Sequence, residues 1–307
     1  MWTKKYMKIA IYGLGKMGSQ IARKLYEGGH TVIASNRSSG LVDEMKSLGM
    51  TGAYSHEEVV ISFGGDQVII WIMVPSDVVD TEIDTWLSLV PKGSILIDGG
   101  NSKWSDTKKR AEKVKEAGST LIDIGTSGGV WGYQNGFSMM IGGDKDGVEM
   151  IKPMLETLKE PTGHYEYFGE NGAGHFVKMV HNAIEYGMME SLAEGYRILK
   201  EGPYKNLDLY KAGVVWQKRS VITSWLNELT RDIMKDNPNQ NGVEGVVAES
   251  GEARWALEVA KEFNIEAPSI QASFDVRLES QNGSVNFATK LLASMRNAFG
   301  GHKINNK

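Results

Sequence analysis

The 307-residue sequence contains no cysteine. This absence excludes disulfide bonds, thiol nucleophiles and cysteine-ligated zinc together. The six histidines include no pair with zinc-site spacing, and no H-E-x-x-H motif occurs. The sequence therefore predicts no metal site.

Long apolar segments are also missing. No stretch approaches the ~20 apolar residues that cross a bilayer, and the apolar run after the basic N-terminus is too short for a signal peptide. We therefore expect a cytoplasmic protein. The net charge of -4 argues against nucleic acid as the main partner. An anionic ligand would have to be held by a local group of cations.

What the sequence does contain is a glycine motif between a strand pattern at residues 8–12 and a helical pattern at 19–28. In that setting the first glycine makes a turn, the second lets the backbone approach a pyrophosphate, and the third packs helix on strand. The helix N-terminus also offers unpaired N–H groups to phosphates. The predicted dinucleotide-binding motif consists of Gly13, Leu14, Gly15, Lys16, Met17 and Gly18.

Cofactor choice depends on the end of the second predicted strand, residues 31–35. It is followed by Asn36, Arg37 and Ser38, about twenty residues after the glycines, where NAD-preferring sites usually place an acidic residue. Because no acidic residue is present there and Arg37 with Ser38 could bind a 2'-phosphate, we expect NADP rather than NAD. The alternative is that Arg37 is only an exposed loop cation.

Further strand patterns occur at residues 67–74, 94–98, 120–124, 137–141 and 165–168, with helical stretches between them. This alternation predicts a Rossmann-type α/β domain over residues 1–170, with a mainly parallel, doubly wound sheet. Ligands bind beyond the carboxyl ends of strands in such sheets. The candidate binding residues in those loops are Val74, Pro75, Asn101, Ser127, Gly128 and Gly129.

Residues 171–307 are predicted to form an all-helical domain for substrate binding and dimerisation. A first helix is expected from about 175 to 200, where Gly202-Pro203 ends it. Further helices are expected at 209–236, at 252–263, from 267 through Arg277, and at 284–298.

One helix in this half carries an unusual polar stripe. Its residues Lys178, His181, Asn182 and Glu185 are spaced i, i+3, i+4 and i+7, so they share one face. The stripe can be a solvated surface. It can also face a cleft, with an amine and a carboxyl ~10 Å apart that serve two proton transfers on one small substrate. Spacing alone leaves both interpretations open.

In combination, these motifs resemble those of the 6-phosphogluconate dehydrogenases, of the short bacterial type within the 3-hydroxyacid dehydrogenase superfamily. The resemblance covers nearly the whole chain and rests on residues 13–18, 98–102, 126–132, 174–182, 184–186 and 296–302. It implies oxidation of 6-phosphogluconate at C3 with a nicotinamide cofactor, followed by decarboxylation to ribulose 5-phosphate without a metal ion.

The resemblance also implies residue roles. Lys178 matches the lysine that takes the proton from the C3 hydroxyl and, as ammonium, then polarises the new carbonyl. To act as a base the amine must be uncharged near neutral pH, which requires desolvation or a nearby cation. Glu185 matches the acid that protonates C1 of the enediol. The groups that match contacts to the substrate carboxylate and hydroxyls are Asn101, Ser127, Gly128, Gly129, His181 and Asn182.

For the substrate phosphate, Tyr186 and Arg277 match family contacts. Arg296 and His302 match a pair that the tail of a second subunit contributes, so the resemblance implies a homodimer or homotetramer with shared sites. This cluster would supply the local cations that an acidic protein needs for an anionic substrate.

Some positions depart from the family pattern. Arg254 stands where long-chain relatives place a phosphate-contacting lysine, which keeps the charge but changes its shape. Arg219 and Thr223 stand where short relatives usually have glycine and arginine. Many short relatives carry an acidic residue at position 36 and prefer NAD, whereas this chain has Asn36.

Two other functions are compatible with part of the sequence. A non-decarboxylating 3-hydroxyacid dehydrogenase or short aldehyde reductase would share the glycine motif, Lys178 and Asn182, but usually lacks the acid at 185 and the arginine–histidine tail. A catalytically silent NADPH-binding regulator would have no need for the Lys178–Glu185 pair. The acid at position 185 and the arginine–histidine tail therefore favour the phosphorylated substrate.

Overall fold

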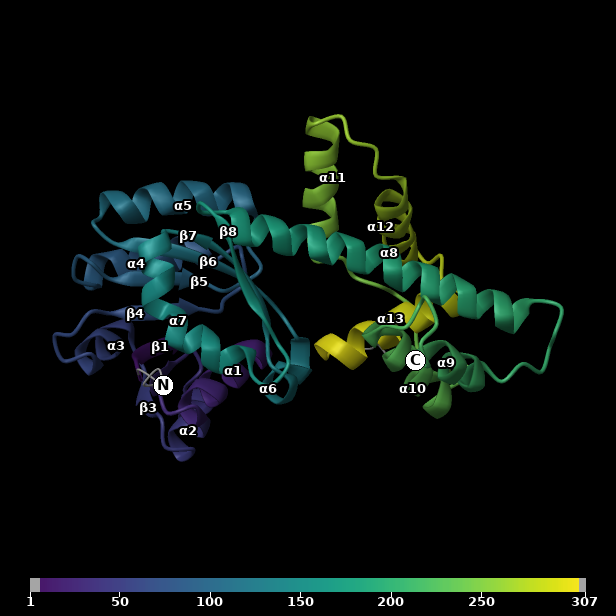
Figure 1. Cartoon of the computed structure of the whole chain (residues 1–307), viewed down its shortest axis with the longest axis horizontal. Helices are drawn as coiled ribbons and strands as arrows, with labels where there is room; N and C mark the ends of the chain where they lie inside the picture. The colour runs from purple at the N-terminus through teal and green to yellow at the C-terminus, as the bar shows by residue number, and fades with distance from the viewer. Residues whose placement is uncertain (1–5, 304–307) are drawn as a thin grey trace. The chain divides into compact units, whose positions relative to one another are not determined.

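A computed structural model describes residues 6–303, so residues 1–5 of the basic N-terminus lie outside the described residues. The chain divides into two compact units, Met1–Lys178 and Met179–Lys307, which we describe separately (Figure 1). The sequence-based boundary between residues 170 and 171 stays a prediction.

The first unit is built on a single eight-stranded sheet with the strand order β3-β2-β1-β4-β5-β6-β7-β8. Neighbouring strands are parallel except β6 and β7, which are antiparallel, so the expected mainly parallel sheet is confirmed. Strand β3 was not predicted, because three residues are too short to show a pattern. The strands are β1 Lys8–Tyr12, β2 Thr31–Ser35, β3 Thr51–Ala53, β4 Ile69–Ile72, β5 Ile95–Asp98, β6 Thr120–Ser127, β7 Ser138–Gly143 and β8 Tyr165–Gly169.

Helices cover both faces of this sheet (Figure 1), as nearly continuous apolar strands require. One apolar core joins alternate strand residues to α1, α2 and α7, and the other joins the opposite strand faces to α3, α4 and α5. The helices are α1 Lys16–Glu27, α2 Ser39–Ser47, α3 His56–Ser62, α4 Val79–Leu89, α5 Trp104–Glu116, η1 Gly129–Trp131, α6 Gly132–Asn135 and α7 Lys145–Lys159.

The second unit is helical. Helix α8 starts in the first unit and continues into the second without a break (Figure 1). Its apolar residues Met189, Ala193 and Tyr196 pack in a core with α9, α10 and α13, and a smaller cluster joins Tyr186 to α11 and α12. The helices are α8 Ala173–Glu201, α9 Leu209–Gln217, α10 Trp225–Asp236, α11 Glu252–Glu262, α12 Pro268–Gln281 and α13 Phe287–Gly300.

The prediction of one helix over residues 209–236 was wrong, because two helices, α9 and α10, occupy that range. Between them Arg219 adopts a left-handed conformation with φ of 64°, which a continuing helix cannot contain. The hydroxyls of Ser220 and Thr223 bond to the Trp216 carbonyl, and Ser224 caps α10 by accepting from a backbone N–H. Local side-chain bonds of this kind compete with helix continuation.

Within residues 6–303, no helix combines the length and the apolar character that crossing a membrane requires.

Candidate functional site

The glycine motif joins β1 to α1, and each of its glycines has a separate steric role. Gly13 has φ of 98°, and a side chain there would collide with the Met73 carbonyl. A side chain on Gly18 would collide with the Gly13 carbonyl. Both positions therefore need glycine to close the turn.

Gly15 differs, since a Cβ built on it would meet no protein atom within 4 Å. It is the N-cap of α1 and makes no side-chain cap hydrogen bond, and the first turn carries no acidic residue. An open approach to uncapped N–H groups fits a pyrophosphate. The residues present thus fit a bound dinucleotide.

The segment after β2 lies beside this loop. Asn36 accepts a hydrogen bond from the Leu14 N–H through Oδ1 at 3.0 Å and donates to the Ser38 carbonyl through Nδ2 at 3.3 Å. The Asn36 side chain therefore ties the glycine motif to the end of β2. Arg37 and Ser38 are exposed, and Ser38 is the N-cap of α2 without a side-chain cap bond.

The loops that follow β4 and β5 contact each other. A Cβ on Gly100 would lie 2.9 Å from the Val74 carbonyl oxygen, so the chain can approach this closely only because residue 100 is glycine. Asn101, the residue after Gly100, is exposed. Val74, Pro75 and Asn101, three of the predicted ligand-binding residues, therefore lie on adjacent loops at the carboxyl edge of the sheet.

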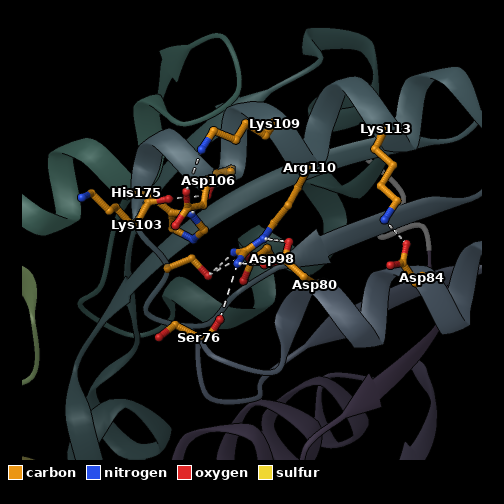
Figure 2. Close-up of polar contacts among 12 residues, drawn as sticks. Ser76, Asp80, Asp84, Asp98, Lys103, Asp106, Lys109, Arg110, Lys113 and His175 are labelled. Atoms are coloured by element: carbon orange, nitrogen blue, oxygen red, sulfur yellow. Dashed lines mark hydrogen bonds and ion pairs between the residues drawn. The ribbon is translucent and has the colours of Figure 1, made fainter.

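An ion-pair network centred on the buried Arg110 connects the same two loops and reaches the exposed Asp80 (Figure 2). Arg110, 4% exposed, donates from Nε and Nη2 to the two carboxylate oxygens of Asp80 at 2.8 and 2.9 Å. Its Nη1 donates to Ser102 Oγ at 3.1 Å and lies 3.4 Å from Asp98 Oδ2, and its Nη2 donates to the Ser76 carbonyl at 3.4 Å. The hydrogen bonds from Arg110 lower the pKa of Asp80.

Arg110 was not among the residues predicted from the sequence. A signal was present, because Asp98 ends a fully buried strand and a buried carboxylate requires a cation or several donors. The partner could not be chosen from sequence, since helix α5 also contains four lysines, Lys108, Lys109, Lys113 and Lys115.

The third loop follows β6 and carries Ser127, Gly128 and Gly129. The two glycines have φ of 135° and 52°, so a sharp left-handed turn presents Ser127 at the strand end. The three residues are partly exposed.

Helix α8 begins against this strand. The buried carboxylate of Asp123 in β6 accepts from the N–H groups of Gly172 at 2.8 Å and His175 at 3.0 Å, which satisfies N–H groups at the helix start. A Cβ on Gly125 would collide with the Cβ of Lys178. The backbone at Lys178 therefore lies directly against Gly125 of β6, which precedes Ser127 by two residues.

The second unit holds the rest of the polar stripe on α8. His181 Nδ1 lies 2.9 Å from Asn182 Oδ1, and Asn182 Nδ2 donates to Glu252 Oε1 at 2.7 Å. Glu252 is only 3% exposed. Glu185, seven residues after Lys178 on the continuous helix, is half-buried. The stripe is therefore not a fully solvated surface.

Two predicted phosphate contacts lie next to each other. The Arg277 guanidinium lies 3.1 Å from the centroid of the Tyr186 ring, and Arg277 is 1% exposed. Burial lowers the pKa of Arg277 to about 10, and the nearby charge of Arg296 acts in the same direction. Arg296 is 8% exposed.

Within residues 6–303 neither Arg277 nor Arg296 forms an ion pair. Two buried guanidinium groups that repel each other are costly unless an anion joins them. The cluster is therefore suited to an anionic ligand.

The remaining predicted residues lie near the surface of the second unit. Arg254 is exposed and paired with Glu249. His302 is exposed, with its ring edge-on to Phe299, and its carbonyl accepts from Asn297. Within the described residues, no group of three or more acidic or histidine side chains could hold a metal ion.

The sheet order reverses direction between β1 and β4, and the glycine motif lies at this switch point. A doubly wound sheet with an open glycine motif at the start of α1 defines a dinucleotide-binding protein of the Rossmann type.

Comparison with known proteins specifies the class further. Residues 8–168 match the NAD binding domain of 6-phosphogluconate dehydrogenase, and residues 174–307 match the 6-phosphogluconate dehydrogenase C-terminal domain. The chain belongs to the 6-phosphogluconate dehydrogenase family.

Relatives in this family are named for use of either cofactor. The chain is 34% identical to the NAD(+)-dependent, decarboxylating 6-phosphogluconate dehydrogenase of Haloferax volcanii, over 98% of this chain and 99% of that one. It is also 34% identical to the NADP(+)-dependent, decarboxylating enzyme of Bacillus subtilis, over 89% of this chain and 61% of that one.

A solved structure has a similar fold. Plasmodium falciparum 6-phosphogluconate dehydrogenase, studied in its apo form and in complexes with NADP+ and with 6-phosphogluconate, matches with a TM-score of 0.81 and 26% identity. The match covers 94% of this chain and 70% of that one.

Proposed function

We propose that the protein catalyses the oxidative decarboxylation of 6-phospho-D-gluconate to D-ribulose 5-phosphate and carbon dioxide, with reduction of NAD(P). The observation that carries this proposal is the buried Arg277–Arg296 pair, which forms no ion pair within residues 6–303. A phosphate would supply the missing negative charge. An unphosphorylated hydroxyacid would bring no phosphate group to these two cations.

The proposed proton transfers use the two ends of the stripe on α8. Lys178 would take the proton from the C3 hydroxyl, and a bound nicotinamide would supply the acceptor for the hydride that leaves C3. Lys178, now an ammonium, gives its proton to the new carbonyl oxygen as the bond from C2 to the carboxylate breaks, which yields the enediol and carbon dioxide. Glu185 then protonates C1 of the enediol, and Lys178 takes back the hydroxyl proton as the ketone forms. A continuous helix keeps these groups ~10 Å apart along its axis.

The other predicted residues hold the substrate in this proposal. Their types suit the task, because amide, hydroxyl and imidazole groups can each bond to hydroxyls, and glycine N–H groups can bond to a carboxylate. The proposed contacts are Asn101, Ser127, Gly128, Gly129, His181 and Asn182 for the sugar acid, and Tyr186, Arg277, Arg296, His302 and Arg254 for the phosphate.

The proposed cofactor preference is for NADP over NAD. Its support is local: residues 36–38 contain no carboxylate, and the exposed Arg37 and Ser38 lie at the start of α2, where a 2'-phosphate would meet a positive dipole end. If this is correct, Arg37→Ala raises KM for NADP about tenfold or more, as expected for loss of a charged hydrogen bond, and changes KM for NAD much less. Equal changes for both cofactors would contradict it.

The arrangement of the C-terminal tail allows a direct test of site sharing. Within one chain Arg296 is close enough to Arg277 to lower its pKa, whereas the sequence predicts that Arg296 and His302 complete a neighbour's site in a homodimer or homotetramer. Lys178→Met and Arg296→Met proteins should each be inactive. Activity after mixing and reassembly would require sharing between subunits, and continued inactivity would require that each chain completes its own site.

The main experiment treats the purified protein with a chelator and follows nicotinamide absorbance with 6-phosphogluconate and either cofactor. We expect reduction of the cofactor with one carbon dioxide released per turnover and no metal requirement. Reduction without carbon dioxide, or activity only on unphosphorylated acids, would contradict the proposal. As a check of roles, Glu185→Gln should slow enediol protonation, so unchanged kcat would exclude Glu185 as the acid.

A further inference from the structure

A buried carboxylate outside the predicted site is bonded to it. Glu252 is the first residue of α11, and its Oε1 accepts from Asn182 Nδ2 at 2.7 Å. Asn182 Oδ1 in turn lies 2.9 Å from His181 Nδ1. Two short hydrogen bonds therefore connect Glu252, which is 3% exposed, to the imidazole of His181.

The position of Glu252 favours a carboxylate. It lies in the first turn of α11 directly after the N-cap Gly251, where the helix dipole stabilises negative charge. A carboxylate only accepts hydrogen bonds. The amide of Asn182 must therefore turn its NH2 group to Glu252.

This orientation of the Asn182 amide determines the direction of its hydrogen bond with His181. With the NH2 group facing Glu252, the carbonyl oxygen of Asn182 faces His181, and an oxygen acceptor requires a proton on the facing nitrogen. The proton of the neutral His181 ring therefore lies on Nδ1, and the unprotonated Nε2 can only accept a hydrogen bond. The reverse orientation of the amide would set its oxygen against the carboxylate.

We propose that Glu252 is a positioning residue that, through Asn182, holds neutral His181 in its Nδ1–H tautomer, so that Nε2 accepts a hydrogen bond from a substrate hydroxyl. The hydroxyl belongs to the sugar acid, and this part rests on the proposed function. The position of the proton in the free protein does not depend on it.

Glu252→Gln tests the inference with little change of shape. Glutamine can donate as well as accept, so the Asn182 amide is no longer forced into one orientation and the Nε2–H tautomer becomes accessible. The double variant Asn182→Asp with Glu252→Gln again places an oxygen acceptor opposite His181 Nδ1. The new carboxylate at position 182 accepts both from the glutamine and from His181 Nδ1. Glu262→Gln, on the exposed end of the same helix, is the matched control.

The readout is 15N NMR of histidine-labelled full-length protein, with the His181 signals assigned by their loss in His181→Gln. We expect a protonated Nδ1 and an unprotonated Nε2 in the wild type, the control and the double variant, and a mixture or reversal in Glu252→Gln. An unprotonated Nδ1 in the wild type, or an unchanged tautomer in Glu252→Gln, would overturn the inference. Thermal unfolding of each variant identifies any that fail to fold, and the double variant then carries the test.

Kinetics supply the second readout. In Glu252→Gln, kcat/KM for 6-phosphogluconate should fall about ten- to hundredfold, the range for a hydrogen bond to a charged group, while KM for the cofactor stays unchanged. Equal loss for both ligands would overturn the positioning role. If the wild-type protein shows the expected tautomer but no activity on 6-phosphogluconate, the proposed function is refuted and the tautomer assignment stands.

Discussion

Glu190 offers a quantitative test of the electrostatics of helix α8. It is 6% exposed, and burial, assisted by the negative charge of Glu194, raises its pKa from 4.5 to about 7. Arg277 opposes this shift but does not cancel it. A carboxyl group with such a pKa is protonated in the folded protein under conditions in which the unfolded chain has lost the proton.

The sign of the effect follows from these two values. Below pH 4.5 the group is protonated in both states. As pH rises from 4.5 to about 7 the folded state keeps a proton that the unfolded chain releases, so the free energy of unfolding falls and is fully reduced above about pH 7. One pKa unit corresponds to about 1.4 kcal/mol, and the shift therefore predicts a loss of about 2 to 3 kcal/mol between pH 5 and pH 8.

Glu190→Gln replaces the titrating group with a neutral side chain of the same shape. The measurement is the free energy of urea unfolding of wild type and variant across this pH range. Subtracting one value from the other removes the contribution of every other titrating group. We expect the difference to move by about 2 to 3 kcal/mol in favour of the variant as pH rises. Glu194→Gln, as control, should reduce the movement because it lowers the pKa of Glu190.

A difference between Glu190→Gln and wild type that stays constant with pH would refute the reasoning. It would mean that Glu190 ionises in the folded protein at its ordinary pKa. The buried environment on α8 would then be better solvated than the 6% exposure of Glu190 implies.

Three further predictions concern the first unit and the connection between α9 and α10. Gly18→Ala should lower stability by about 1 to 3 kcal/mol in thermal or urea unfolding, because its Cβ meets the Gly13 carbonyl. Gly15→Ala should keep the wild-type Tm and weaken cofactor binding in titration. Equal losses of Tm in the two variants would contradict their separate roles. Arg110→Met should cost about 3 to 5 kcal/mol, since it leaves Asp98 buried without its cation, and a loss below about 1 kcal/mol in urea unfolding would exclude that role. Arg219→Gly should raise stability by about 1 kcal/mol, because φ of 64° strains any side chain, and a lower Tm would show that the arginine side chain compensates for its backbone.

Several elements were predictable because their signals are local. The glycine motif after a buried strand, the stop at Gly202-Pro203 after α8, and the apolar strands of the first unit each follow from steric or periodic rules that act within a few residues. The Rossmann-type sheet, the helical second unit and the family are accordingly confirmed. The roles of Lys178 and Glu185 stay predictions, since their spacing on one helix leaves their chemistry to be tested.

The wrong prediction of one helix over residues 209–236 has a physical cause. The break between α9 and α10 depends on the left-handed Arg219 and on hydroxyls that bond back to the Trp216 carbonyl, and no glycine or proline marks it. Periodicity records the apolar face of a helix but not a competing hydrogen bond, so the two helices looked like one.

The sequence by itself determined which residue types stand at the strand ends and along the face of α8, because strand and helix periods depend only on local backbone geometry. Tertiary structure alone decided which partners these residues have. The pairs Arg110–Asp98 and Glu252–Asn182 join residues 12 and 70 positions apart, and the Arg277–Arg296 cluster joins two different helices. These residues come together only when the chain packs and excludes water from their side chains, which is a property of the packed chain and not of any local pattern.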